Sequence, residues 1–91
     1  MSSMKGSLGH GQGAAGAMET CLAVIALNQG VLPPNLNLEE PDAAMLDHVR
    51  FCPDHTTPWP LNDSQQQRRI LLKNSFGFGG TNASLCIASY P

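Results

Sequence analysis

Lys5 and His10 are the residues near the N-terminus whose side chains can do chemistry, and both lie in the glycine-rich segment KGSLGHGQG. A helix is expected to begin shortly after them, which places the imidazole at the positive end of the helix dipole and near the Lys5 ammonium. Both positive charges favour the neutral imidazole. A neutral imidazole can donate a hydrogen bond to a substrate carbonyl and stabilise an enolate. The structural alternative is a helix-capping histidine beside a solvated lysine.

The same segment holds Gly11, Gly13 and Gly16 in the G-x-G-x-x-G spacing of dinucleotide-binding turns. That motif needs a strand directly before the turn and an acidic residue at the end of the next strand. The residues before Gly11 are rich in Gly and Ser, and Glu39 and Glu40 follow a Pro-Pro pair. A dinucleotide-binding fragment therefore remains a minor alternative, beside a helix start that simply packs closely.

Three residues in a proline-rich segment, His48, Cys52 and His55, are of types that bind zinc. A structural zinc site uses four ligands, and no fourth follows nearby. We therefore expect a surface loop here and no metal.

The elements that must position Lys5 and His10 follow from the residue pattern. Ala14 to Asn28 predicts a helix because Ala, Met, Glu and Leu dominate it, and Gly30 is suited to cap its end. Apolar residues on nearly all sides predict that this helix is buried. Residues 1 to 13 are expected to form a loop, Asn35 to Leu38 a short extended segment and Leu46 to Phe51 a short strand.

The C-terminal part of the chain predicts two strands joined by a sharp turn. Ile70 to Asn74 and Ala83 to Ser89 have strand-like composition, and the three glycines of Phe76 to Gly80 favour a tight turn between them. A buried helix followed by two strands indicates an α/β fold, as a piece of a layered sheet protein.

Composition limits the possible functions of the 91 residues. The chain is 42% hydrophobic but only 13% charged, well below the roughly 25% of an average soluble domain. We therefore expect a partner chain or further sequence to cover part of its surface. A net charge of −2 without a basic patch argues against nucleic-acid binding. No apolar run is long enough for a bilayer span, and the N-terminus does not resemble a secretory signal. Three unpaired cysteines favour a reducing, cytosol-like compartment.

Three blocks of the sequence resemble the β-ketoacyl-acyl-carrier-protein synthases, condensing enzymes of the thiolase-like superfamily. KGSLGHGQGAAGAME, from Lys5 to Glu19, resembles their lysine–histidine block, with Ser3 also in place. NSFGFGGTN, from Asn74 to Asn82, resembles their C-terminal signature, and LPPNLNL, from Leu32 to Leu38, their extended segment after the helix. The resemblance implies an α/β fold, the C-terminal portion of a thiolase-like layered fold with a buried helix and strands of a mixed sheet.

The resemblance also implies roles for individual residues. His10 corresponds to the second catalytic histidine, which binds the malonyl thioester carbonyl and stabilises the carbanion formed on decarboxylation. Lys5 corresponds to the active-site lysine, and Phe78 to the gating phenylalanine, whose backbone N–H completes the oxyanion hole. Gly11 and Gln12 stand where members often have apolar residues, which predicts a looser segment after His10.

The implied function is decarboxylative Claisen condensation in fatty-acid or polyketide chain elongation. The family's nucleophilic cysteine and first histidine lie upstream of these blocks, whereas Cys21, Cys52 and Cys86 occupy the helix, the loop and the last strand. We therefore expect residues 1–91 to be a C-terminal segment that is incomplete without upstream sequence and inactive alone. A non-catalytic partner or assembly subunit of a synthase is the alternative.

The implied partners are acyl carrier protein bearing acyl- or malonyl-pantetheine and, in the full-length family, a second copy of the chain. No cofactor, nucleic acid or membrane is implied. The cytoplasm is the expected compartment, with plastid or mitochondrion as alternatives.

Overall fold

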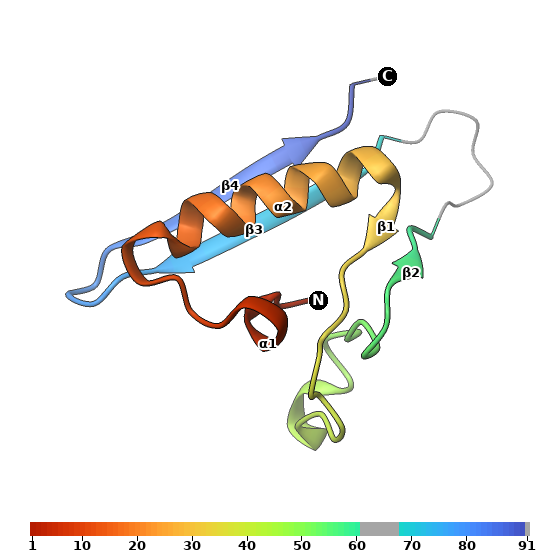
Figure 1. Cartoon of the computed structure of the whole chain (residues 1–91). Coiled ribbons are helices and arrows are strands. Elements are labelled where there is room, and N and C mark those ends of the chain that lie inside the picture. The colour runs from red at the N-terminus through yellow and green to blue at the C-terminus, as the bar shows by residue number, and fades with distance from the viewer. Residues whose placement is uncertain (61–67, 91) are drawn as a thin grey trace.

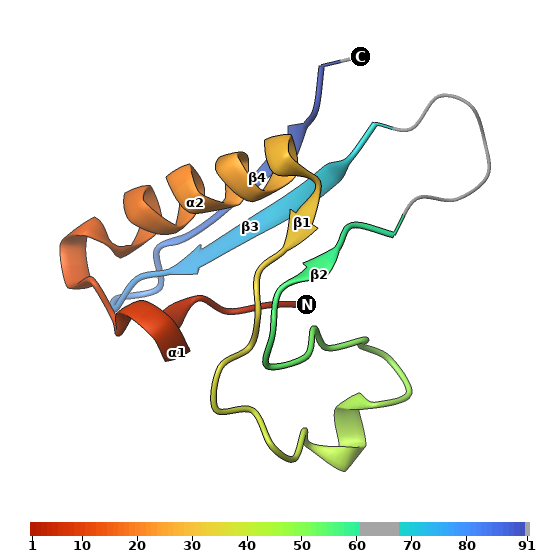
Figure 2. The same cartoon turned by 45° about the vertical axis from the view of Figure 1, so that its right-hand side comes forward.

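One long helix, α2, lies along one face of an antiparallel hairpin formed by β3 and β4 (Figure 1). The computed structural model describes residues 1–60 and 68–90. A second, much shorter pair of strands, β1 and β2, lies beyond the C-terminal end of α2 (Figure 2). The elements follow one another as α1, η1, α2, β1, η2, β2, β3 and β4, where η marks a 3-10 turn.

Helix α2 spans Ala15–Gln29, within one residue of the prediction at each end. It ends at Gly30, which adopts the left-handed conformation with φ of 71° and donates its N–H to the carbonyl groups of Ala26 and Leu27. The guanidinium of Arg69 donates a second hydrogen bond to the Leu27 carbonyl, at 2.9 Å. The predicted role of Gly30 as the helix cap is therefore confirmed.

The inner face of α2 consists mostly of small side chains. Ala15, Ala23, Ala26 and Leu27 are buried, whereas Met18, Val24 and Ile25 on other sides of the helix are 42–51% exposed. The prediction that the helix is buried on all sides is thus wrong for this chain. The described residues supply one layer for α2 to pack against, so only one face is covered, in keeping with the low charge of the sequence.

The hairpin joins β3, Ile70–Phe76, to β4, Asn82–Ala88, with Ile70 opposite Ala88 and Phe76 opposite Asn82. Both predicted strands are confirmed, with β3 longer by two residues and β4 displaced by one. The predicted α/β class is confirmed as well. The strand pairs in the described ranges are all antiparallel, and the layered fold with a mixed sheet stays a prediction.

The two faces of β3 have different surroundings. Leu71, Lys73 and Ser75 alternate with exposed residues and are more buried than these, and Lys73 contacts α2. On the outer face Ile70, Leu72 and Phe76 are 58–78% exposed. One face of the hairpin is therefore covered by the helix, and the opposite face is open.

Three local predictions differ from the structure. Residues 1–13 contain a short helix, α1, at Lys5–Leu8 and the beginning of η1, Gln12–Ala14, rather than loop alone. Residues 35–38 form a turn closed by the Leu38 N–H and the Asn35 carbonyl, instead of an extended segment. Residues 46–51 contain turn and coil but no strand, after the 3-10 turn η2, Ala43–Met45, which the Asp42 side chain caps.

The short strands lie elsewhere than predicted. Strand β1, Val31–Leu32, pairs antiparallel with β2, Thr57–Pro58. The pairing places the proline-rich loop between them, so that the chain leaves α2 and returns beside its end (Figure 2).

Asn35 is the buried polar residue that joins the N-terminal segment to this loop. Its Oδ1 accepts the Ser3 N–H at 2.7 Å, and its Nδ2 donates to the carbonyl groups of Met1 and Cys52. Its own N–H donates to the Pro53 carbonyl. The side-chain hydrogen bonds of Asn35 join segments that are far apart in the sequence. They fix the position of the chain just before Lys5.

In the part of the chain that the structure describes, no helix combines the length and the apolar character needed to cross a bilayer.

Candidate active site

Lys5 is the first residue of α1, and its position depends on Ser3, whose Oγ accepts the Lys5 N–H at 3.4 Å. Its side chain is 42% exposed, and its ammonium donates to Oε1 of Glu19 on α2. Lys5 is therefore paired, in contrast to the solvated lysine of the structural alternative.

Glu19 holds two ammonium groups, one on each carboxylate oxygen. Oε1 accepts from Lys5, and Oε2 lies 2.9 Å from Nζ of Lys73 on β3. Both Glu19 and Lys73 side chains are 12% exposed. The hydrogen bond from Lys5, and next that from Lys73, hold the pKa of Glu19 below its ordinary value, against the opposing effect of burial. Glu19 is consequently an ionised carboxylate between α2 and β3.

His10 lies in the connection between α1 and η1, and its ring position is set by the backbone. Its Nδ1 accepts the Gln12 N–H at 3.0 Å. Gln12 has φ of 53°, a conformation that non-glycine residues rarely adopt. Because Nδ1 uses its lone pair in this bond, the neutral ring carries its proton on Nε2. The exposed imidazole can therefore donate a hydrogen bond from Nε2.

Phe78 lies in the turn between β3 and β4, and its side chain is fully exposed. The turn is closed by a hydrogen bond of 2.6 Å from the Gly77 N–H to the Thr81 carbonyl. Gly79 and Gly80 both have positive φ, which glycine adopts without strain. Among the described residues, no protein acceptor takes the Phe78 N–H. That N–H is available to a ligand.

The segments that contain His10 and Phe78, the connection from α1 to α2 and the turn between β3 and β4, lie at the same end of α2. In both views the turn between β3 and β4 lies beside the connection from α1 to α2 (Figures 1 and 2). The contact between Lys73 and Glu19 ties the two regions together. Within the described ranges no hydrogen bond or ion pair links Phe78 directly to Lys5 or His10. The segments that carry the two sequence motifs, around His10 and around Phe78, are therefore neighbours, but no direct hydrogen bond or ion pair joins these residues in the described ranges.

The other sequence candidates are placed differently. Cys52 is buried, whereas His48 and His55 are exposed, and the described residues contain no group of three side chains able to hold a metal ion. The segment before Gly11 is helix and coil, so the strand that a dinucleotide-binding turn requires is missing there.

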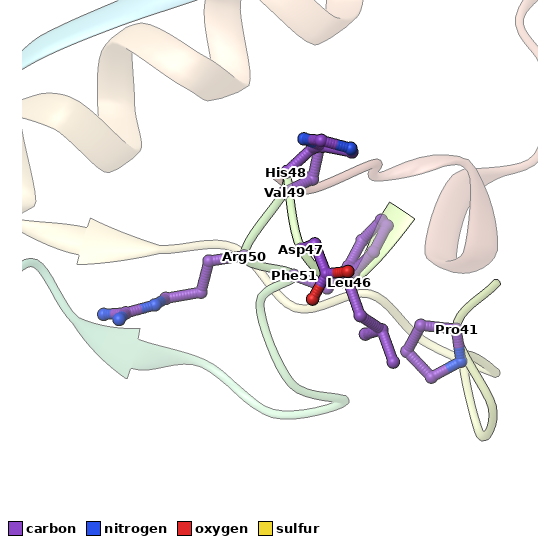
Figure 3. A pocket seen from close by; sticks show the side chains of 7 residues that line it. All are labelled: Pro41, Leu46, Asp47, His48, Val49, Arg50 and Phe51. Atoms are coloured by element: carbon purple, nitrogen blue, oxygen red, sulfur yellow. The ribbon is translucent and has the colours of Figure 1, made fainter. Parts of the chain in front are cut away.

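A surface hollow in the loop between β1 and β2 also fails to gather polar groups. Figure 3 shows Leu46 beside Pro41, whereas the His48 and Arg50 side chains point away in different directions. The hollow therefore offers no converging set of ligands.

Sequence reasoning missed Glu19 and Lys73, although each had a recognisable signal. Glu19 follows Ala15 by four residues and precedes Ala23 by four, so all three share one helical face. Lys73 alternates with Leu71 and Ser75, which places it on the strand face that meets the helix. Opposite charges at two such positions could have been paired from the sequence.

Comparison with known families gives a match at the N-terminal part of the chain. Residues 1–39, which include Lys5, His10 and Glu19, match the family model described as "Beta-ketoacyl synthase, C-terminal domain". No solved structure gives a significant match to the chain.

Individual relatives match over nearly the whole chain. The chain is 46% identical over 88 residues to the mitochondrial 3-oxoacyl-[acyl-carrier-protein] synthase of Arabidopsis thaliana, and the match covers 97% of this chain and 17% of that protein. It is 40% identical over 91 residues to 3-oxoacyl-[acyl-carrier-protein] synthase 2 of Rhizobium meliloti, covering 99% of this chain and 19% of that protein. A highly reducing polyketide synthase of Aspergillus aculeatus is 42% identical over 90 residues, covering 97% of this chain and 4% of that protein.

The chain thus spans a fifth or less of the length of these relatives. The family match and the relatives agree on the same class of enzymes. In sequence, residues 1–39 are thus similar to the C-terminal domain of the β-ketoacyl synthases, and nearly the whole chain is similar to part of 3-oxoacyl-[acyl-carrier-protein] synthases.

Proposed function

We propose that this chain supplies Lys5, His10 and Phe78 to the active site of a β-ketoacyl synthase, which extends an acyl chain by decarboxylative Claisen condensation with malonyl-acyl-carrier protein. The observation that carries this proposal is the hydrogen bond from the Gln12 N–H to Nδ1 of His10. It leaves the Nε2–H of a neutral imidazole as a donor at an exposed position. A donor of this kind suits the carbonyl oxygen of a malonyl thioester.

In the proposed reaction the acyl group is first held as a thioester on a cysteine. Malonyl thioester loses carbon dioxide, and the electron pair of the broken C–C bond forms an enolate whose oxygen accepts the His10 Nε2–H. The enolate carbon then attacks the acyl carbonyl. The resulting oxyanion accepts the Phe78 N–H, and the cysteine thiolate leaves as the β-ketoacyl thioester forms.

Lys5 supplies a fixed positive charge beside these steps. Its ammonium is held through Glu19 yet remains partly exposed, so it can order negative charge at the site without donating its proton. The proposal assigns it an electrostatic role rather than a role in proton transfer.

The nucleophilic cysteine is assigned to sequence outside these 91 residues. Cys52 is buried in the loop, and Cys21 and Cys86, although exposed, lie within α2 and on β4 rather than at a helix N-terminus, where a thiolate is activated. We therefore propose that residues 1–91 form one segment of a larger synthase domain with the thiolase-like layered fold, and that they do not condense substrates alone.

The proposed partners are acyl carrier protein carrying acyl- or malonyl-pantetheine and a second copy of the complete enzyme. The cytoplasm is the proposed compartment, in keeping with the three free cysteines, and plastid or mitochondrion are the alternatives.

A chimera tests the catalytic proposal. Residues 1–91 replace the matching segment of the Arabidopsis relative, and decarboxylation of malonyl-acyl-carrier protein and formation of the β-ketoacyl product are measured separately. His10→Ala is expected to lower both rates about 100-fold or more, the usual cost of losing one such donor. His48→Ala, in the exposed loop, is the matched control. Full activity of the His10→Ala chimera would overturn the proposal and favour a non-catalytic assembly subunit.

A further inference from the structure

Lys73 is a nearly buried cation just before the NSFGFGGTN motif, and the proposed reaction does not use it directly. Its Nζ donates to the Asn74 carbonyl and to Oγ of Ser75, both at 2.7 Å, and forms an ion pair with Oε2 of Glu19 at 2.9 Å. An ammonium has three N–H groups, and three protein partners surround this one. Lys73 is therefore fixed in position by these partners.

Lys5 differs from Lys73 in both exposure and partners. Its side chain is 42% exposed, against 12% for Lys73, and its ammonium contacts Glu19 among the described side chains. It therefore keeps N–H groups that can face a ligand. The two lysines that contact one carboxylate thus differ in their ability to bind a ligand. Lys73 is surrounded by protein partners, whereas Lys5 is partly exposed to solvent.

The charge of the cluster follows from this sharing. Two ammonium groups and one ionised carboxylate carry a net charge of +1, since Lys73 adds a second cation to the pair of Lys5 and Glu19. Without Lys73, both oxygens of Glu19 would face Lys5 alone and the remaining pair would be neutral. At an effective dielectric constant of about 20, such a change is felt over several ångströms.

We propose that Lys73 is a positioning residue for Lys5. By occupying Oε2 of Glu19 it restricts Lys5 to Oε1 and keeps the cluster positively charged. It also fixes β3, which leads into the turn of Phe78, against α2, which follows the His10 connection. The consequence for condensation rests on the proposed function, whereas the coupling of the three side chains does not.

Nuclear magnetic resonance of the 91-residue chain tests the coupling directly. In Lys73→Met, the titration midpoint of the Glu19 carboxyl carbon is expected to move up, and the Cε resonance of Lys5 to shift as Lys5 binds both oxygens. Arg68→Met removes one exposed positive charge from the same part of the chain and is the control. Glu19 and Lys5 signals that respond no more to Lys73→Met than to Arg68→Met would overturn the proposal.

A milder variant covers the case in which Lys73→Met does not fold, as judged by circular dichroism. Ser75→Ala keeps the Lys73 charge and removes one of its two hydrogen-bond acceptors. It is expected to shift the Glu19 midpoint in the same direction by a smaller amount. An unchanged midpoint in a folded Ser75→Ala chain would count against the proposal.

The chimera described above separates this proposal from the proposed function. Lys73→Met is expected to lower kcat roughly tenfold, as for weakening one partly screened charge interaction, with KM for the carrier-protein substrates unchanged. Lys5→Met combined with Lys73→Met is expected to be no worse than Lys5→Met alone. Independent, additive losses would overturn the positioning role. Full activity of Lys5→Met would instead overturn the proposed function of Lys5, and the Glu19 titration would still decide the coupling.

Discussion

The Glu19 carboxylate and the Lys73 ammonium meet at 2.9 Å between α2 and β3, although they lie near opposite ends of the chain. Helical spacing places Glu19 in line with Ala15 and Ala23, and these small neighbours let β3 come close to the helix. Strand alternation places Lys73 on the face that meets them. The ion pair thus forms because the helical repeat of α2 and the strand alternation of β3 place Glu19 and Lys73 on the two faces that pack together.

Glu19→Gln is expected to lower the free energy of unfolding at neutral pH and to flatten its dependence on acid pH. The pKa of Glu19 is lower in the folded chain than in the unfolded chain, first because of Lys5 and then because of Lys73. The stabilisation is therefore complete above the unfolded-state pKa of about 4.3 and is lost as pH falls through the lower folded-state pKa. Urea denaturation from pH 7 downwards measures this, with the exposed Glu40→Gln as control. Parallel curves for Glu19→Gln and the unsubstituted chain would contradict it.

His10 is expected to hold its proton on Nε2 when the ring is neutral, because Nδ1 accepts the Gln12 N–H. Nitrogen-15 spectra of the imidazole at about pH 8, above the ordinary histidine pKa, distinguish the two tautomers. The exposed His55 serves as the comparison, since its Nδ1 lies near the Asp54 carboxylate instead. A predominant Nδ1–H form of His10 would contradict the proposed donor.

Gly30→Ala is expected to destabilise the chain by about 1 kcal/mol or more, because a Cβ is strained at this φ. The added Cβ would also lie 2.8 Å from the Arg69 guanidinium, which must then move from the helix end. Gly13→Ala is the matched control, since a Cβ there meets nothing within 4 Å. Thermal unfolding followed by circular dichroism compares the two, and equal midpoints would refute the expectation.

Leu27→Ala is expected to cost about 2–5 kcal/mol, because it leaves a cavity at a side chain that is only 4% exposed. Val24→Ala, on the 42% exposed side of the same helix, should cost far less. Urea denaturation measures both. Similar losses for the two variants would show that α2 does not pack on the hairpin through this face.

Asn35→Ala is expected to cost about 1–3 kcal/mol, because it leaves the Ser3 N–H and the carbonyl groups of Met1 and Cys52 without this buried partner. Amide hydrogen exchange at Ser3 should accelerate more than exchange within α2. Asn28→Ala, at an exposed helical position, is the control. Unchanged exchange at Ser3 would contradict the anchoring role of Asn35.

The long elements could be predicted because their signals are local. A run of good helix formers ending at Gly30 specified α2, and two strand-like runs around a glycine turn specified the hairpin. The short elements could not be predicted in this way. Val31–Leu32 and Thr57–Pro58 become strands only because the loop brings them together, and two-residue strands carry little propensity of their own.

The residues of the candidate site could be predicted from the sequence motifs, but the hydrogen bonds and ion pairs between its side chains could not. The positions of Lys5, His10 and Phe78 followed from the resemblance, whereas the tautomer of His10 depends on the backbone of Gln12, which adopts an unfavourable φ. The pairing of Glu19 with two lysines depends on the packing of α2 on β3. Burial of α2 was overestimated because amphipathic analysis of one helix does not count the layers available to cover it.

The open face of the hairpin has a consequence for work with the isolated chain. Ile70, Leu72 and Phe76 present apolar side chains to water, and among residues 1–60 and 68–90 the strands β3 and β4 pair with each other alone. Exposed apolar strands with unpaired backbone groups add readily to one another. We therefore expect concentrated samples to associate through this hairpin, so the experiments on the isolated chain should be run at the lowest concentration that gives a signal.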